Sequence, residues 1–212
     1  MPDSLAVIGA DVRACRLCKL SQTRTLGVPG EGSPNAEIMF IGEGPGFHED
    51  QQGRPFVGAA GQLLTEMLEV IGLRRQDVFI TNVVRCRPPG NRDPLPDELA
   101  ACDTYTLRQV AVLTPKLIVT LGRFSMARFF PPGPMRELHG RSRDWNGMTC
   151  LAMYHPAAIL RTPTVEMRRI YEDDFRKIPP LLAEATKRRE AQAMIATAAT
   201  EPAKQLDQLP LF

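Results

Sequence analysis

Four short runs of apolar residues punctuate the chain, at residues 37–42 (EIMFIG), 78–84 (VFITNVV), 116–122 (KLIVTLG) and 148–154 (MTCLAMY). In each run the apolar residues follow one another with little alternation, which is typical of strands buried on both faces of a parallel sheet. A glycine, arginine or histidine closes or follows each run. The pattern therefore predicts four buried strands.

Helical patterns separate these runs, at residues 60–71, 96–113 and 122–130. A last helix is predicted from residue 164 through the 180s, with an interruption at Pro179-Pro180. Strands that alternate with helices predict an α/β fold, here a three-layer α/β/α sandwich with a central four-stranded, mainly parallel sheet. Ligands of such folds bind beyond the carboxyl ends of the strands, where loops start at Gly42, Arg85, Gly122 and His155.

The 212 residues suffice for one domain with a tail. We predict a folded domain over residues 1–188 and a flexible tail over residues 189–212, because the composition becomes alanine-rich without a clear hydrophobic period. A helical extension as far as Thr200 is compatible with this composition. The tail nevertheless ends in Leu209, Leu211 and Phe212, which a merely solvating tail does not need.

The charge balance and the N-terminal sequence narrow the class of protein. Twenty-six basic and 24 acidic residues give a net charge of +2, which excludes a wholly polybasic nucleic-acid coat. The first residues lack the basic and apolar regions of a signal peptide, and no stretch of about 18 apolar residues occurs. We therefore expect a soluble cytoplasmic protein. Its 16 glycines and 19 prolines predict many shaped loops.

Four of the five cysteines are arranged like metal ligands. Cys15 and Cys18 form a C-x2-C pair, and Cys86 and Cys102 follow later in the chain. In a reducing compartment such thiols bind metals more often than they form disulfides. Buried free thiols, a structural zinc and a 4Fe-4S cluster all fit this spacing. Cys150 lies within the fourth apolar run and is predicted to be a small core residue.

A glycine-rich loop, GEGPG at residues 42–46, follows the first predicted strand. Such a loop can hold a phosphate at the start of a helix. However, neither G-x-G-x-x-G nor G-x-x-x-x-G-K-[ST] occurs here, and Glu43, Glu49 and Asp50 would repel a polyphosphate. The loop is therefore expected to bind a ligand other than a polyphosphate.

The longer run GEGPGFHEDQQGRPFVGAAGQLL, at residues 42–64, resembles the first motif of family 4 uracil-DNA glycosylases, the iron-sulfur branch of that superfamily. The resemblance continues through TNVVRCRPPGNR at residues 81–92, TLG at residues 120–122 and YHPAAILR at residues 154–161, and covers about residues 10–180. One departure is Phe47-His48, where family members commonly carry acidic residues. The resemblance implies a 4Fe-4S cluster held by the family's four ligand positions, Cys15, Cys18, Cys86 and Cys102.

The resemblance also implies a DNA repair enzyme. It would flip uracil out of DNA and hydrolyse the N-glycosidic bond, leaving an abasic site for base excision repair. Phe56 would stack on the uracil, and the Asn82 amide would accept from N3–H and donate to O4, a pattern that cytosine reverses. His155 would donate to O2 of the departing base. The predicted uracil site comprises Gly42, Gly44, Phe56, Asn82 and His155.

Stabilisation of the sugar cation requires a carboxylate, and the motif offers two. Family 1 enzymes place an aspartate where this chain has Gly44, so Glu43 and Glu49 are the catalytic candidates beside His155. Thymine would be excluded sterically by the loop at residues 43–49. The predicted DNA contacts include an apolar wedge, basic side chains and a polar side chain that could also position water: Arg85, Arg87, Asn91, Arg92, Ile159, Leu160 and Arg161.

The expected partners follow from this activity. The substrate would be uracil-containing DNA, double- or single-stranded, bound by a monomer associated with the nucleoid. The end of the chain resembles the peptide that binds the bacterial sliding clamp, through Gln208, Leu209, Leu211 and Phe212. The alternative is a non-catalytic iron-sulfur protein that associates with DNA, such as a polymerase accessory module. A pure binder needs no pyrimidine pocket, so Phe56, Asn82 and His155 favour the enzyme.

Overall fold

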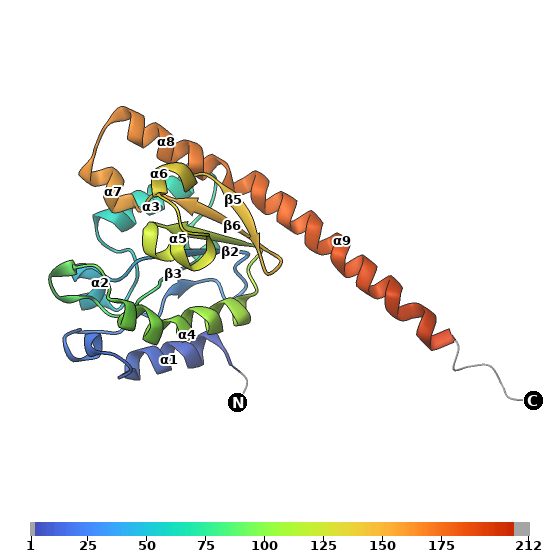
Figure 1. Ribbon diagram of the computed structural model, residues 1–212, viewed down its shortest axis with the longest axis horizontal. Coiled ribbons are helices and arrows are strands. Elements are labelled where there is room, and N and C mark those ends of the chain that lie inside the picture. The colour runs from blue at the N-terminus through green and yellow to red at the C-terminus, as the bar shows by residue number, and fades with distance from the viewer. Residues whose placement is uncertain (1–2, 206–212) are drawn as a thin grey trace, which may run out of the picture.

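A six-stranded sheet forms the centre of the protein, in the order β1-β3-β2-β4-β6-β5 (Figure 1). The computed structural model describes residues 3–205, with side chains described through residue 197. The four middle strands are parallel to one another: β3 (Phe79–Asn82), β2 (Ile38–Gly42), β4 (Leu117–Leu121) and β6 (Met148–Met153). The antiparallel edge strands are β1 (Glu31–Gly32) and β5 (Ser142–Trp145).

The four predicted strands are confirmed as the parallel centre of the sheet, but the predicted strand number was too low. Strand β1 has only two residues, and β5 carries the polar sequence SRDW with mostly exposed side chains. Neither edge strand is buried on both faces, so neither produces an apolar run in the sequence.

Two helical layers cover the sheet, which confirms the α/β/α sandwich. Ile38 and Phe40 of β2 belong to the apolar cluster on one face, and Met39 and Ile41 belong to the cluster on the other. This alternation explains why the strands read as continuous apolar runs. The first face packs against α3 (Ala59–Val70), α7 (Pro156–Arg161), α8 (Val165–Arg176) and the start of α9 (Ile178–Gln205), and the second against α4 (Pro96–Leu113), α5 (Arg123–Phe129) and α6 (Met135–Leu138).

The remaining helical segments lie in the N-terminal half. They are α1 (Leu5–Ala14), η1 (Lys19–Gln22), α2 (Phe47–Gln52), η2 (Arg75–Asp77) and η3 (Pro89–Asn91). Helix α1 lies beside α4, and their apolar side chains share a third cluster that includes Cys86 and Cys102.

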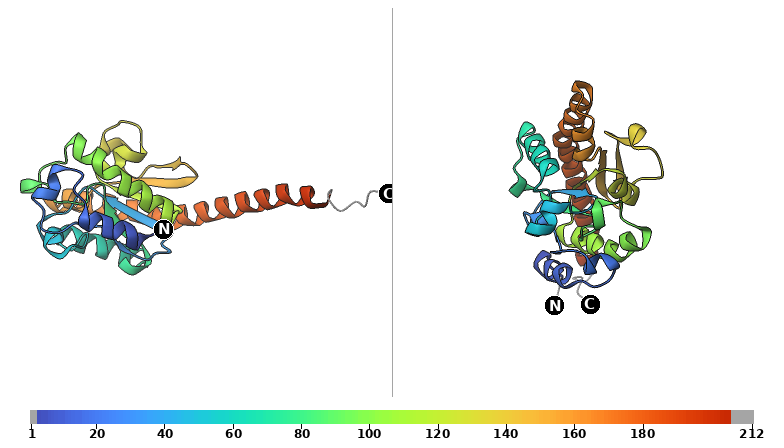
Figure 2. Two further views of the ribbon diagram at one scale, coloured as in Figure 1. Left: turned by 90° about the horizontal axis from the view of Figure 1, so that it is seen from below. Right: turned by 90° about the vertical axis from the view of Figure 1, so that its left-hand side faces the viewer.

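The predicted interruption of the last helix occurs at Lys177, two residues before the first of the two prolines. Helix α8 ends at Arg176 and α9 begins at Ile178, which places Pro179 and Pro180 in a first helical turn, where a missing N–H costs little. Helix α9 projects from the body and runs past residue 189 without a break (Figures 1 and 2). Across the described residues the helix has no break at residue 189, and the division into residues 1–188 and 189–212 stays a prediction. The clamp-like peptide at residues 208–212 lies outside the described residues.

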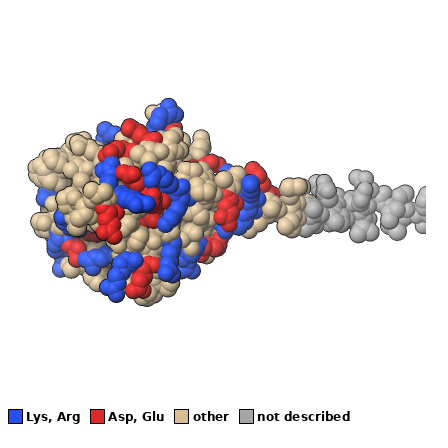
Figure 3. Space-filling model, turned by 90° about the horizontal axis from the view of Figure 1, so that it is seen from above, with Lys and Arg blue, Asp and Glu red and all other residues tan. Residues whose placement is uncertain are grey.

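Across residues 3–205, none of the helices is both long and apolar enough to cross a membrane. Basic and acidic side chains are interspersed over the face drawn in Figure 3.

The topology brings the predicted functional loops to one edge of the sheet. Gly42 pairs in register with Asn82 at the ends of β2 and β3, and Leu121 pairs with Met153 at the ends of β4 and β6. The chain passes from β2 to β3 on one side and then to β4 on the other side of β2. Such a reversal opens a crevice at the carboxyl ends of the strands, where α/β proteins bind ligands.

Candidate active site

A cavity of about 330 Å³ lies at this edge of the sheet. Its size is in the range of small-molecule sites. Among the residues predicted for the site, it is lined by Glu43, Gly44, Glu49, Phe56, Asn82, Asn91, Arg92, His155 and Arg161. Residues from four segments of the sequence therefore meet in one cavity.

The Phe56 ring is held against the His155 ring, with centroids 5.6 Å apart and an angle of 29° between the ring planes. Phe56 has a φ of +52°, a backbone conformation that is unfavourable for a bulky residue. Arg75 secures this turn by donating to the carbonyl oxygens of Phe56 (3.0 Å) and Pro55 (2.8 Å). A Cβ on Gly61 would lie 1.8 Å from the Phe56 oxygen, so only glycine fits there. Arg75 and Gly61 therefore position the ring.

The Asn82 amide lies beside Phe56 and is almost completely buried, with 1% of the residue exposed. Its Oδ1 has no hydrogen-bond partner among the described residues. A Cβ on Gly42 would lie 2.4 Å from the Phe56 ring and 2.5 Å from this oxygen, so Gly42 permits their close approach. A buried acceptor without a donor costs about 1–3 kcal/mol, which a ligand with a matching N–H would offset.

His155 is the N-cap of α7, and its Nδ1 accepts a hydrogen bond from the Ala157 N–H at 3.1 Å. Nδ1 must therefore be unprotonated, which leaves the ring proton on Nε2. Burial, assisted by the charge of Arg161, lowers the pKa of His155 to about 4. At neutral pH the ring is an uncharged donor through Nε2.

The two candidate carboxylates differ in their surroundings. Glu49 accepts from three backbone N–H groups, those of Gly46 (3.1 Å), Val57 (2.8 Å) and Gly58 (2.9 Å). It ties the glycine-rich loop to the start of α3, and this use of its oxygens argues against a catalytic role. In the part of the chain with described side chains, the half-buried Glu43 carboxylate has no hydrogen-bond or ion-pair partner. Burial, followed by the charge of Asp93, raises the pKa of Glu43.

Two of the predicted DNA contacts are wrong. Arg85 is 1% exposed, and its Nη2 donates to Thr106 and Gln109 inside the protein. Ile159 is 3% exposed, because the helical turn of α7 directs it into the core while its neighbour Leu160 remains 44% exposed. Neither buried side chain can reach DNA.

The other predicted DNA contacts lie near the cavity. Arg92 forms a bidentate ion pair with the buried Glu98, at 2.7 and 2.9 Å, which neutralises its charge. Arg87 donates through Nε to Asn91 Oδ1 at 2.7 Å. Arg161 is exposed and lines the cavity. Arg87, Leu160 and Arg161 therefore remain available to a bound nucleic acid.

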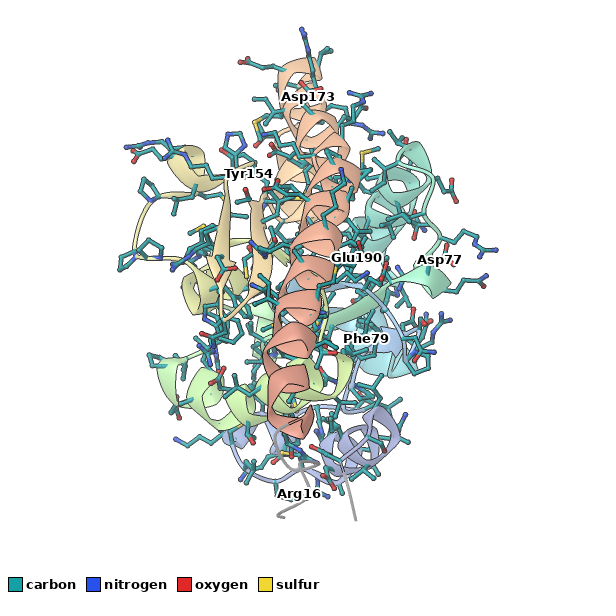
Figure 4. All side chains as sticks on the ribbon, turned by 90° about the vertical axis from the view of Figure 1, so that its right-hand side faces the viewer. Arg16, Asp77, Phe79, Tyr154, Asp173 and Glu190 are labelled. Atoms are coloured by element: carbon teal, nitrogen blue, oxygen red, sulfur yellow. The ribbon has the colours of Figure 1, made fainter. Side chains whose placement is uncertain are left out.

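The four cysteines of the predicted metal site belong to one packed cluster beside α1 and α4. Arg24 connects two of their segments by donating to Cys86 Sγ (3.0 Å) and to the Cys15 carbonyl oxygen (3.1 Å). None of these cysteines lines the cavity. In Figure 4, Arg16, near the first cysteine pair, lies at the lower end of the view, and Tyr154, before His155, lies in its upper part.

Among the described residues, no three His, Cys, Asp or Glu side chains are placed to hold one metal ion. The fifth cysteine, Cys150, is fully buried in β6, which confirms it as a core residue.

Arg75, Gly61 and the positioning role of Glu49 were not among the predicted features of the site. Gly61 lies within the motif at residues 42–64, so the sequence contained a pattern from which its importance could have been predicted. Arg75 lies in no motif, and its partners are backbone carbonyls that the sequence cannot place.

The comparisons with known proteins agree with this geometry. A family model described as the uracil DNA glycosylase superfamily matches residues 29–177. A type-4 uracil-DNA glycosylase of Sulfurisphaera tokodaii is 51% identical over 189 residues, which cover 84% of this chain and 85% of that protein. Type-4 uracil-DNA glycosylases of Archaeoglobus fulgidus (46% identical; 84% and 94% covered) and Thermotoga maritima (44%; 82% and 92%) are also similar. Because these matches span the loops that build the cavity, the chain belongs to the uracil-DNA glycosylase superfamily and to its type-4 branch.

Proposed function

We propose that this protein excises uracil from DNA, by hydrolysing the N-glycosidic bond to release free uracil and leave an abasic site for base excision repair. The observation that carries the proposal is the buried, unpartnered Asn82 Oδ1 beside Phe56. Uracil N3–H supplies the donor that this oxygen lacks, and the amide N–H donates to O4. Cytosine presents an acceptor at N3 and would leave both acceptors unpaired.

The leaving group is stabilised by His155. A flipped uracil that stacks on Phe56 carries growing negative charge at O2 as the bond breaks. The Nε2–H of the neutral His155 ring donates to this oxygen and needs no proton from solution. A preorganised donor at a developing oxyanion contributes about 3–4 kcal/mol to transition-state stabilisation.

Glu43 is the group that acts on the sugar. Its carboxylate stabilises the oxocarbenium-like sugar or orients the attacking water, with Asn91 as a further water-positioning group. Glu49 instead fixes the loop through its three backbone hydrogen bonds. Pro45 and Gly46 of the same loop line the cavity. The hydrogen bonds of Glu49 hold this loop in place, so it excludes the thymine methyl group by steric clash.

Replacement of Asn82 by alanine tests this assignment. It should lower kcat/KM on uracil-containing oligonucleotides by about 10- to 100-fold, as expected for the loss of two hydrogen bonds in a buried site. Excision is measured as alkali-induced cleavage, with matched thymine-containing oligonucleotides as the control. If the native protein cleaves neither substrate, or both equally, the proposed activity is wrong.

We also propose a 4Fe-4S cluster on Cys15, Cys18, Cys86 and Cys102. The resemblance to family 4 uracil-DNA glycosylases supports an iron-sulfur cluster here, whereas four thiolates alone would also suit a zinc ion. Arg85 supports the fit, because its guanidinium lies beside Cys86 and Cys102 with Nε and Nη1 buried and unpaired. A cluster with four thiolates supplies the missing negative charge. When bound, it cross-links the N-terminal segment to α4 and the segment after β3, away from the cavity.

DNA binding is assigned to the accessible side chains at the rim of the cavity. Leu160 is the apolar wedge that fills the space of the flipped base, and Arg87 and Arg161 contact phosphates. The substrate is uracil-containing DNA, double- or single-stranded, and the enzyme acts as a cytoplasmic, nucleoid-associated monomer.

The C-terminal peptide is assigned to the sliding clamp on its sequence alone, through Gln208, Leu209, Leu211 and Phe212. Deletion of residues 208–212 should abolish retention of the protein by immobilised clamp and leave excision on short oligonucleotides unchanged. Equal retention of both forms would contradict the assignment.

A further inference from the structure

An aromatic side chain stands open to solvent beside the cavity. Phe47, the first residue of α2, is 52% exposed. The Arg87 guanidinium lies over its ring, with Cζ 5.2 Å from the ring centroid, and the His48 ring meets it edge-on, with centroids 5.5 Å apart and an interplanar angle of 80°. These three residues, from the start of α2 and the segment after β3, form a surface that we call the Phe47 platform.

Both segments that form the Phe47 platform are next to residues that line the cavity. Gly46, immediately before Phe47, and Pro88, immediately after Arg87, both line the cavity. Arg87 is also bonded to Asn91, another lining residue, at 2.7 Å. The Phe47 platform therefore lies next to the wall of the cavity.

The composition of the platform suits a nucleotide. Aromatic rings stack on the faces of nucleobases, and each such contact is worth about 1–3 kcal/mol to single-strand binding. A guanidinium adds charge-assisted hydrogen bonds to phosphate. Arg87 is held in place by Asn91, so a phosphate contact would require little further ordering of its side chain. The exposed Phe47 ring suits the base of a nucleotide, and the Arg87 guanidinium beside it suits the phosphate of the same nucleotide.

We propose that the Phe47 platform binds the nucleotide next to the flipped uracil, by stacking its base on Phe47 while Arg87 contacts its phosphate. This inference rests on the proposed function. In a single strand the neighbouring base is free to turn onto Phe47, whereas in a duplex it stays paired and stacked. The platform therefore makes single-stranded uracil-containing DNA the preferred substrate.

Replacement of Phe47 by alanine tests the platform. We expect KM for a single-stranded uracil oligonucleotide to rise by about 5- to 100-fold with kcat unchanged, and KM for the matched duplex to change much less. Phe47→Trp should keep the native KM, because it restores a stacking surface. Val70→Ala is the control, since Val70 is also exposed but lies at the far end of α3 from the cavity-lining Ala60.

A fluorescent base reports the stacking directly. With 2-aminopurine beside the uracil, native protein and Phe47→Trp should quench its emission on binding, and Phe47→Ala should not. An unchanged KM in Phe47→Ala, a loss of kcat at constant KM, or equal losses in single strand and duplex would overturn the proposal. If the native protein excised no uracil, the proposed function would fail, and the affinities of native protein and Phe47→Ala for uncleaved single strands would still decide the platform.

Discussion

Replacement of His155 by alanine should lower kcat on uracil-containing DNA by about 10²- to 10³-fold, the usual loss when one oxyanion donor is removed. The ring is already oriented, because its Nδ1 is bonded to the Ala157 N–H and its proton lies on Nε2. The alanine variant also loses the cap of α7, so a second variant is needed. His155→Asn retains an oxygen that can accept from Ala157 but is too short to donate to the base. It should keep the native Tm and remain as slow as His155→Ala.

The corresponding variant for the group that acts on the sugar is Glu43→Gln. It should lower kcat by a smaller factor than His155→Ala does. Burial and Asp93 raise the pKa of Glu43, so its active carboxylate is lost as the pH falls through this raised pKa. Native kcat should therefore decline on the acidic side, and Glu43→Gln should lack this decline. His155, with a pKa of about 4, stays neutral above pH 5 and adds no step there. If His155→Ala kept near-native excision while Glu43→Gln abolished it, our ranking of the two groups would be wrong.

The centre of the fold could be predicted because its strands are buried on both faces. The alternation of Ile38 and Phe40 with Met39 and Ile41 between two apolar clusters leaves no polar position in β2. The edge strands could not be predicted, because β1 and β5 are defined by backbone pairing with β3 and β6 and not by apolar side chains. Their pairing depends on tertiary contacts that no local pattern records.

Within the site, the motifs identified which residues meet but not how each side chain is used. Arg85 and Arg87 are two positions apart in one basic segment, yet one is buried beside the cysteines and the other lies over Phe47. Similarly, Glu43 and Glu49 looked equivalent, because the backbone donors that occupy Glu49 come from residues 57 and 58. Such differences depend on the path of distant backbone segments, which sequence patterns do not specify.

Replacement of Arg85 by methionine should destabilise the cluster-bound protein by about 3–5 kcal/mol, the usual cost of removing one partner of a buried ion pair. Arg85 stays charged at neutral pH, although burial lowers its pKa to about 10. Its unpaired Nε and Nη1 leave it without a counter-charge unless the neighbouring thiols are thiolates, which a bound cluster requires. The variant should therefore lose the visible absorbance of the cluster faster under chelator, and its Tm should fall.

The cluster-free protein provides the decisive comparison. Without the cluster, burial raises the pKa of the neighbouring Cys86 and Cys102, so both thiols are neutral at pH 7, and Arg85 is a buried cation without an ion-pair partner among the described residues. Arg85→Met then removes an unfavourable charge, so its cost in stability should be much smaller than in the cluster-bound form, with only the hydrogen bonds to Thr106 and Gln109 lost. Arg128→Met, which breaks the ion pair with Asp103 near the surface, should change either form by less than about 1 kcal/mol. If Arg85→Met lowered the free energy of unfolding equally with and without the cluster, Arg85 would serve the packing of α4 and would not balance the charge of the cluster.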